Sequence, residues 1–190
     1  DEVGSSISTI AIYSKIVHEQ VSNTTFNNEP LLQKISEHAS EIMESMNDIV
    51  WNINTRNDAF EHIISRMREH ASQLLEVQNY SLHFKFDGHL QHLRLTMEKR
   101  RDFYLIYKEA LNNIAKYAHG KNAWISLTLS GNNLELDIRD DGVGFELGNE
   151  RQEGNGLANM RFRATALKGK IHFDSTPGEG THVYLICPMT

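Results

Sequence analysis

The fold is best indicated by residues 134–145, Leu134-Glu-Leu-Asp-Ile-Arg-Asp140-Asp-Gly-Val-Gly-Phe145. The first half of this stretch alternates apolar and polar residues with a period of two, which predicts a strand with one buried face. Counting by twos places Asp140 on the same face as Leu134, Leu136 and Ile138. A carboxylate at the end of an inward face is costly unless a donor meets it. The stretch therefore predicts a strand that carries an acidic group inward, where the carboxylate should meet a donor.

The loop after this strand contains two glycines, Gly142 and Gly144. Glycine lets the backbone come close to a flat ligand, and an inward acceptor such as Asp140 suits the exocyclic amine of adenine. A capped turn with an Asp-Gly signal explains the same residues about as well when they are taken alone. Both interpretations remain open at this point.

Strands surround this stretch on both sides. Period-two alternation before it, with Ala123, Ile125, Leu127 and Leu129 on one face, makes a hairpin across the turn at 131–133. Further strands are predicted over 80–86, 170–175 and 181–186. Thr181 follows a Gly-containing turn and shares its face with Val183 and Leu185, so its hydroxyl should point inward, toward adenine or Asp140.

Helical periodicity predicts three helices between these strands. The first follows a cap at Asn57 or Asp58, the second spans about 97–118, and the third about 157–167. The apolar stripes of the first two are Phe60, Ile64, Met67, Ala71 and Leu74, and Phe103, Tyr107, Ala110, Ile114 and Tyr117. Because strands and helices do not alternate as repeating βα units, we expect an α+β sandwich with helices on one face of a mixed sheet.

Residues 1–55 have a different periodicity. Two heptad seams, from Val3 to Val21 and from Leu32 to Ile53, flank a polar break at 23–30. They predict an antiparallel two-helix hairpin that pairs with a second copy as a four-helix bundle, so that the chain is a homodimer. Packing of the hairpin on the rest of its own chain is the alternative. The domains are then a dimerisation hairpin, 1–55, and a second domain, 56–190.

Three polar residues, Glu109, Asn113 and Lys116, fall on one face of the second helix of that domain. An amide oxygen can complete a Mg²⁺ shell made mostly of phosphate oxygens and water, and a lysine can meet phosphate as a point charge. Taken by itself, the row is explained better by a solvated helix face with ordinary polar contacts. Further on, Gly154-Asn-Gly156-Leu157 is expected to open a helix whose free N–H groups bind anions, although an ordinary glycine-rich loop is the alternative.

Composition limits the function classes. The chain has 190 residues and a formal net charge of −6, which argues against direct nucleic-acid binding. The single cysteine, Cys187, excludes an internal disulfide framework and a zinc site built from cysteines. No apolar stretch approaches the roughly 18 residues of a membrane span.

The order Glu109…Asn113, Asp140-x-Gly-x-Gly, Gly154-x-Gly156, Gly180-Thr181 resembles the Bergerat-type (GHKL) ATP-binding fold of gyrase, Hsp90 chaperones, sensor histidine kinases and MutL-type proteins. The fuller strings at 109–118, 156–164 and 177–181 are similar to those of sensor histidine kinases that phosphorylate LuxR-type response regulators. The first residues resemble the segment that follows the phosphorylated histidine in their HisKA_3 hairpin. The run from 46 to 58 is similar to Bacteroidetes-type members.

The resemblance implies ATP and Mg²⁺ as cofactors and gives each residue a role. Asn113 would be the Mg²⁺ ligand, Glu109 would polarise water or order the metal shell, and Asp1 would accept the proton of the attacking histidine. The residues implied in nucleotide binding are Asn112, Asn113, Lys116, Tyr117, Asp140, Gly142, Gly144, Gly154, Gly156, Leu157, Arg161 and Thr181.

The function implied is that of a cytoplasmic core of a two-component sensor, with a parent protein anchored in the inner membrane. ATP would phosphorylate a histidine expected just before Asp1, and the phosphate would pass to an aspartate of a response regulator receiver domain. Ser5 stands where many relatives carry a glutamine for phosphatase activity, which puts that activity in doubt. A dimeric scaffold with an idle nucleotide site, a protein serine kinase of the same ATP fold and another ATPase of the superfamily are the alternatives.

Overall fold

The computed structural model describes residues 60–147 and 150–189, together with single residues between Ile10 and Ile42; the side chains of residues 91, 92 and 150–154 lie outside the description. The chain divides into two units, Asp1–Asn54 and Thr55–Thr190, and each is considered by itself. Most of the hairpin predicted for 1–55 lies outside the described residues. The four-helix bundle, and the position of Asp1 in it, therefore stay predictions.

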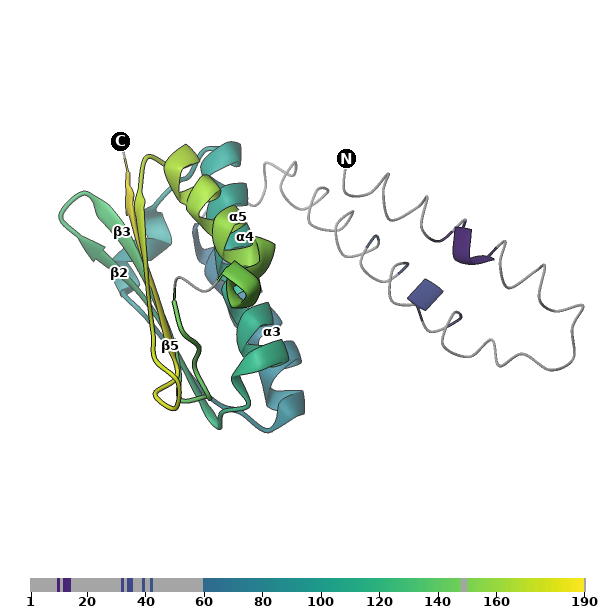
Figure 1. Ribbon diagram of the computed structural model, residues 1–190. Coiled ribbons are helices and arrows are strands. Elements are labelled where there is room, and N and C mark those ends of the chain that lie inside the picture. The colour runs from purple at the N-terminus through teal and green to yellow at the C-terminus, as the bar shows by residue number, and fades with distance from the viewer. Residues whose placement is uncertain are drawn as a thin grey trace, which may run out of the picture. The chain divides into compact units, whose positions relative to one another are not determined.

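The second unit is built on a five-stranded sheet (Figure 1). Its strands are β1 (Ser81–Phe86), β2 (Asn122–Ser130), β3 (Asn133–Asp140), β4 (Lys170–Ser175) and β5 (Thr181–Pro188), and their spatial order is β1-β2-β3-β5-β4. β1 runs parallel to β2, while all other neighbours are antiparallel. The predicted hairpin is confirmed as β2–β3, and β5 continues two residues beyond its predicted end.

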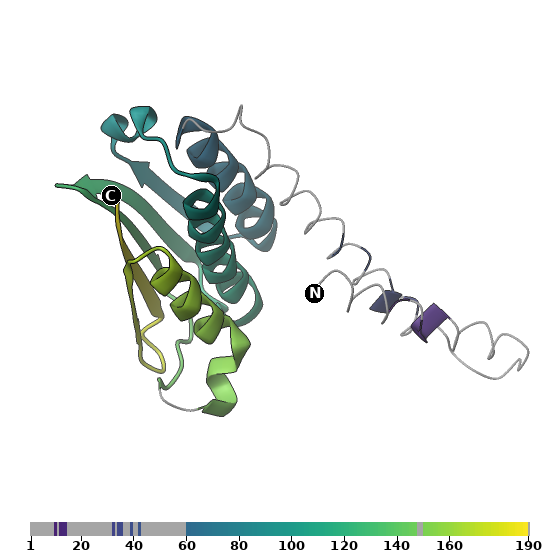
Figure 2. The ribbon, with the colours of Figure 1, turned by 90° about the horizontal axis from the view of Figure 1, so that it is seen from above.

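Three helices cover one face of this sheet: α3 (Phe60–Leu75), α4 (Met97–Asn113) and α5 (Glu150–Ala166) (Figures 1 and 2). Short 3₁₀ turns, η2 (Glu76–Gln78) and η3 (Gly88–His92), flank β1, and a π-helical turn, η4 (Ile114–Ala118), extends α4. The predicted α+β sandwich is confirmed. No helix among the described residues is long and apolar enough to cross a bilayer.

The core lies between the helices and the sheet. The buried face of α3 follows the predicted stripe, with one difference at its end: Leu75 is fully buried and Leu74 is partly exposed. The stripe advances by four residues there, which stays closer to the 3.6-residue period than the predicted step of three. On the sheet, the inward residues of β2 and β3 that were predicted by parity are buried, Asp140 among them, except Leu129 near the end of β2, which is half-buried.

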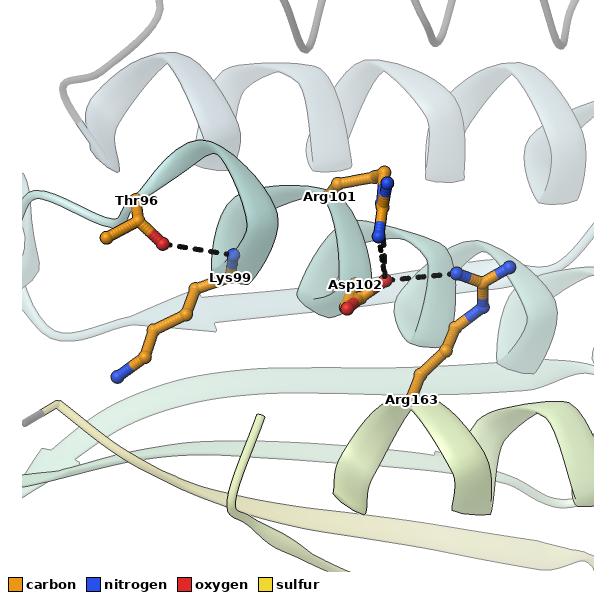
Figure 3. Close-up of polar contacts among 5 residues, drawn as sticks. All are labelled: Thr96, Lys99, Arg101, Asp102 and Arg163. Atoms are coloured by element: carbon orange, nitrogen blue, oxygen red, sulfur yellow. Dashed lines mark hydrogen bonds and ion pairs between the residues drawn. The ribbon is translucent and has the colours of Figure 1, made fainter. Parts of the chain in front are cut away.

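Polar contacts fix where α4 begins and how it meets α5 (Figure 3). The Thr96 side chain caps α4 by accepting a hydrogen bond from the Lys99 backbone N–H at 3.3 Å. One turn later, Oδ1 of the buried Asp102 accepts from Nη1 of Arg163 on α5 at 3.1 Å. Arg101 approaches the same oxygen at 3.3 Å from a more exposed position. The two helices are thus joined by an ion pair whose carboxylate is largely withdrawn from water.

The beginning of α5 differs from the prediction. The helix starts at Glu150, seven residues before the expected Leu157, so Gly154 and Gly156 lie inside it. Residues 150–153, Glu-Arg-Gln-Glu, favour a helix strongly enough to offset two interior glycines. Inside a helix these N–H groups are engaged by preceding carbonyls. The anion site predicted at a helix N-terminus beginning with Gly154 is therefore wrong.

Candidate functional site

A cleft of about 330 Å³ opens between α4, η4, α5 and the adjoining ends of β3 and β5. The structure brings most of the predicted binding residues to it: Glu109, Asn113, Tyr117, Asp140, Gly144, Gly156, Leu157 and Thr181. Apolar side chains such as Ile114, Ile138 and Val183 complete its wall. The cleft combines an apolar lining with a few convergent polar groups, as small-molecule sites do.

Asp140 lies at the buried end of the cleft and is 6% exposed. Burial raises the pKa of its carboxyl, because it disfavours the charged form; the backbone N–H groups of Gly142 and Thr181 lower the pKa in part, and the nearby Asp141 raises it. The Gly142 N–H donates to Oδ1 at 2.9 Å. Thr181 is the direct cross-strand partner of Asp140. The predicted acidic group is therefore delivered to a site, as the strand parity required.

Backbone contacts hold the loop after β3 against η4. The Val143 N–H donates to the Ala118 carbonyl at 2.7 Å, and a Cβ on Gly142 would collide with that same carbonyl oxygen. Gly144 has φ +60°, and a Cβ there would collide with the Thr176 carbonyl. Both glycines are required by close backbone packing, and this packing forms one end of the cleft.

Asp141 is not among the described residues that line the cleft, and its carboxylate organises the start of β2. It accepts from the backbone N–H groups of Lys121 and Asn122 at 2.7 and 2.8 Å, and from Nδ2 of Asn122 at 2.7 Å. Desolvation raises the pKa of Asp141, but these donors outweigh it and the pKa is lowered overall. Sequence analysis missed this role because its only local signal was an Asp-Gly pair.

At the other end of the cleft, α4 and α5 approach closely. A Cβ on Gly156 would collide with Oε1 of Glu109 and would lie 3.6 Å from Nδ2 of Asn113. In this arrangement of the Glu109 side chain, the carboxylate and the amide face α5 across a narrow gap at Gly156. These two groups supply oxygen atoms of the kind that Mg²⁺ prefers, so the donor set fits that ion.

Several predicted residues do not line the cleft. Asn112, Lys116 and Gly142 are absent from its described wall, and Arg161 lies with its guanidinium 5.1 Å from the centre of the Phe173 ring. Gly154 lies inside α5, and whether it lines the cleft is outside the described residues. Tyr117 does line it but is 66% exposed, so its place on the inner apolar stripe is wrong. The π-turn of η4 adds a residue to the helical turn and changes the direction of the side chains after Asn113.

Ser175, at the end of β4, is a residue that sequence analysis missed. Its Oγ accepts from the Phe145 backbone N–H at 3.0 Å, donates to the Gly180 carbonyl at 2.9 Å, and lies 3.2 Å from Oγ1 of Thr181. It stands directly behind the wall of the cleft, since Phe145 and Thr181 line the cleft. Its sequence signal was only a serine before a turn.

Known proteins resemble this chain in sequence. The model of the family described as histidine kinase-, DNA gyrase B-, and HSP90-like ATPase matches residues 98–190. The oxygen sensor histidine kinase NreB of Staphylococcus carnosus is 34% identical over 114 residues, which are 60% of this chain and 33% of that protein. The chain thus spans about a third of the length of this relative.

Solved structures share the fold. Histidine kinase AdeS of Acinetobacter baumannii superposes with a TM-score of 0.68 at 16% identity, covering 96% of this chain and 95% of that chain. The histidine kinase domain of a blue-light activated kinase from Erythrobacter litoralis gives 0.61 at 15% identity, with 96% of each chain covered. Residues 98–190 thus resemble ATPase domains of the histidine kinase-, DNA gyrase B- and HSP90-like kind in sequence, and the fold is the one that these solved histidine kinases have.

Proposed function

We propose that this chain is the catalytic core of a two-component sensor histidine kinase, of the subfamily that phosphorylates LuxR-type response regulators. ATP binds in the cleft with Mg²⁺, phosphorylates a histidine, and the phosphate then passes to an aspartate of a receiver domain. The observation that carries the proposal is the buried carboxylate of Asp140 at the end of a cleft in a domain that resembles this ATPase family. A carboxylate so placed accepts hydrogen bonds from the exocyclic amine of adenine.

Different residues of the cleft bind different parts of the nucleotide. Asp140 and Thr181 receive the base, while Glu109 and Asn113 lie where they can order the metal and the phosphates. The Mg²⁺ ion supplies neutralisation of the charge on the β- and γ-phosphates. Gly156 brings α5 against Glu109, so the α4–α5 contact encloses the phosphate end of the cleft.

The transfer itself needs groups outside the described residues. A ring nitrogen of the histidine expected before Asp1 attacks the γ-phosphorus, a new N–P bond forms, and the bond between phosphorus and the ADP oxygen breaks. The histidine's ring proton passes to the carboxylate of Asp1. Positioning and electrostatic stabilisation supply most of the catalysis of such transfers.

The assembly is proposed from the sequence. Residues 1–55 form the dimerisation hairpin and 56–190 the ATP-binding domain, so the working unit is a homodimer. Its partner is the receiver domain of a response regulator. The core acts in the cytoplasm, and the parent protein carries the sensor and is anchored in the inner membrane.

Calorimetric titration with ADP and Mg²⁺ tests the nucleotide site. The chain should bind ADP, and Asp140→Asn should weaken binding at least about tenfold, since a buried donor–acceptor match is lost. Asp174→Asn is the matched control, because Asp174 is an exposed carboxylate on β4, away from the cleft. Unchanged affinity in Asp140→Asn, or no binding by the parent chain, would contradict the proposal.

A further inference from the structure

We propose that Ser175 is a positioning residue: it accepts the proton of the Thr181 hydroxyl, so that Thr181 can only accept hydrogen bonds from a ligand in the cleft. This arrangement sets selectivity for a 6-amino purine over a 6-oxo purine. The inference rests on the proposed nucleotide site. It concerns a residue outside the cleft wall, to which neither the sequence motifs nor the comparisons assign a role.

The argument begins with the protons available to Ser175. A serine hydroxyl has one proton to donate and two lone pairs that accept. Its Oγ lies 2.9 Å from the Gly180 carbonyl oxygen, which can only accept, so the serine proton is used there. The Phe145 N–H, which can only donate, takes one lone pair at 3.0 Å. The contact with Thr181 at 3.2 Å must then use the remaining lone pair.

It follows that Thr181 donates its own proton to Ser175. The two lone pairs of the Thr181 oxygen are left for the cleft, which this residue lines. Asp140 pairs directly with Thr181 across the strands, at a Cβ separation of roughly 5 Å for such pairs. An ionised carboxylate also only accepts. Both polar side chains at this end of the cleft therefore present acceptors to the base.

Two acceptors side by side match an exocyclic amine, which carries two N–H donors. They repel the carbonyl oxygen at the same position of hypoxanthine or guanine. Removing the Ser175 hydroxyl would free the Thr181 proton, and Thr181 could then rotate and donate to a carbonyl oxygen. The substitution should reduce the preference for the 6-amino purine more than it reduces overall nucleotide affinity, because Ser175 does not touch the ligand.

The test compares ADP with inosine diphosphate by calorimetry in the parent chain and in Ser175→Ala. The parent should prefer ADP, and Ser175→Ala should reduce the ratio of the two affinities by about three- to tenfold, the worth of one hydrogen bond. Ser175→Thr keeps a hydroxyl and should restore the ratio. Ser130→Ala is the control, because Ser130 is exposed and pairs with Asn133, at the far end of the β2–β3 hairpin from Asp140.

A thermodynamic cycle with Thr181→Val makes the test specific. Thr181→Val should itself reduce the ratio, and adding Ser175→Ala to it should change the ratio no further. An unchanged ratio in Ser175→Ala, or equal effects with and without the Thr181 hydroxyl, would overturn the inference. If Ser175→Ala unfolds, Ser175→Cys, of similar shape with a weak donor, carries the same comparison. Failure of the parent to bind either nucleotide would instead overturn the proposed function.

Discussion

Asp140 is a carboxylate whose location is unfavourable for the folded protein. It is nearly buried, and its pKa is raised chiefly by desolvation. A group with a raised acid pKa binds protons more tightly in the folded state, so its ionisation reduces stability as the pH rises from the usual range of an aspartate through the raised value. Such a cost is common where a residue is retained for binding rather than for stability.

The pH dependence of ADP binding should show this raised pKa. Acidification should weaken binding at pH values at which an ordinary aspartate is still ionised, because the protonated carboxyl accepts the adenine amine less well. Over the same window, the melting temperature of the parent chain without nucleotide should fall relative to that of Asp140→Asn as the pH rises. Calorimetry and thermal unfolding across a pH series check both trends. Binding that stays constant until the ordinary range of aspartate would speak against the account.

Gly142 gives a prediction with a control inside the same domain. A methyl group at this position collides with the Ala118 carbonyl oxygen, so Gly142→Ala must displace either η4 or the loop after β3. Overpacking of this kind costs about 1–3 kcal/mol, and ADP binding should weaken as well. Gly88→Ala meets nothing within 4 Å and should be close to neutral. Urea unfolding and titration with ADP compare the two variants. Equal free energies of unfolding and equal ADP affinities in Gly142→Ala and Gly88→Ala would refute the close-packing argument.

Sequence alone located some of these residues and missed others for a physical reason. Strand parity is local, so it placed Asp140 on the inner face correctly. Asp141 accepts from backbone N–H groups 19 and 20 positions away in the chain, and Ser175 accepts from the Phe145 N–H, 30 positions away. A period or a motif cannot reveal which N–H a side chain will meet after folding. These two positioning residues therefore became visible only in the structure.

At the scale of elements, the strands were predicted better than the ends of the helices. The strands β2, β3 and β4 follow strict period-two alternation, and their bounds agree closely with the prediction. α5 began earlier than predicted because glycines were taken as the loop, although the residues before them favour a helix. The π-turn η4 carries no periodic signal, so the direction of Tyr117 could not be predicted.

The contact between α4 and α5 depends on the pair Asp102–Arg163 (Figure 3). The Asp102 side chain is 10% exposed and that of Arg163 28%, whereas Arg101, which touches the same oxygen, is 53% exposed. Asp102→Asn should lower the free energy of unfolding by about 1–3 kcal/mol, because the partly buried Arg163 guanidinium loses its charged partner. Arg101→Ala should cost less than about 1 kcal/mol, as exposed pairs do.

Urea unfolding of the two variants and of Arg163→Gln checks this ranking. Asp102→Asn and Arg163→Gln should couple in a double-mutant cycle, since they remove the same contact. Because α5 carries Gly156 and Leu157 to the cleft, both variants should also weaken ADP binding. If Arg101→Ala and Arg163→Gln lowered the free energy of unfolding equally, burial would not determine the strength of this contact.

At the scale of the whole molecule, the proposed function gives the two units separate tasks. The described residues that line the proposed nucleotide cleft lie within 109–183, while the heptad seams lie within residues 1–55. A division of this kind predicts that the oligomeric state and nucleotide binding change independently. Sequence periodicity predicted the division, but the geometry of the hairpin lies outside the described residues.

Charges placed in the second seam test this separation. The double variant Ile42→Asp with Ile49→Asp should convert a dimer into a monomer, because two carboxylates per chain would be buried in the bundle. Gln33→Asp, which lies off the seam, should leave the dimer intact. Light scattering measures the mass, and titration shows whether ADP still binds with the affinity of the parent. A parent chain that is monomeric at all concentrations would contradict the proposed bundle.

Phosphate transfer is the most direct test of the central claim. The protein, with the residues that precede Asp1, is incubated with Mg²⁺ and ATP radiolabelled in the γ-phosphate, beside Asp140→Asn as the inactive control. The account predicts an acid-labile, base-stable label on a histidine immediately before Asp1, which passes to a receiver domain and is absent from Asp140→Asn. Nucleotide binding without any label on a histidine, or a different residue at the position before Asp1, would contradict it.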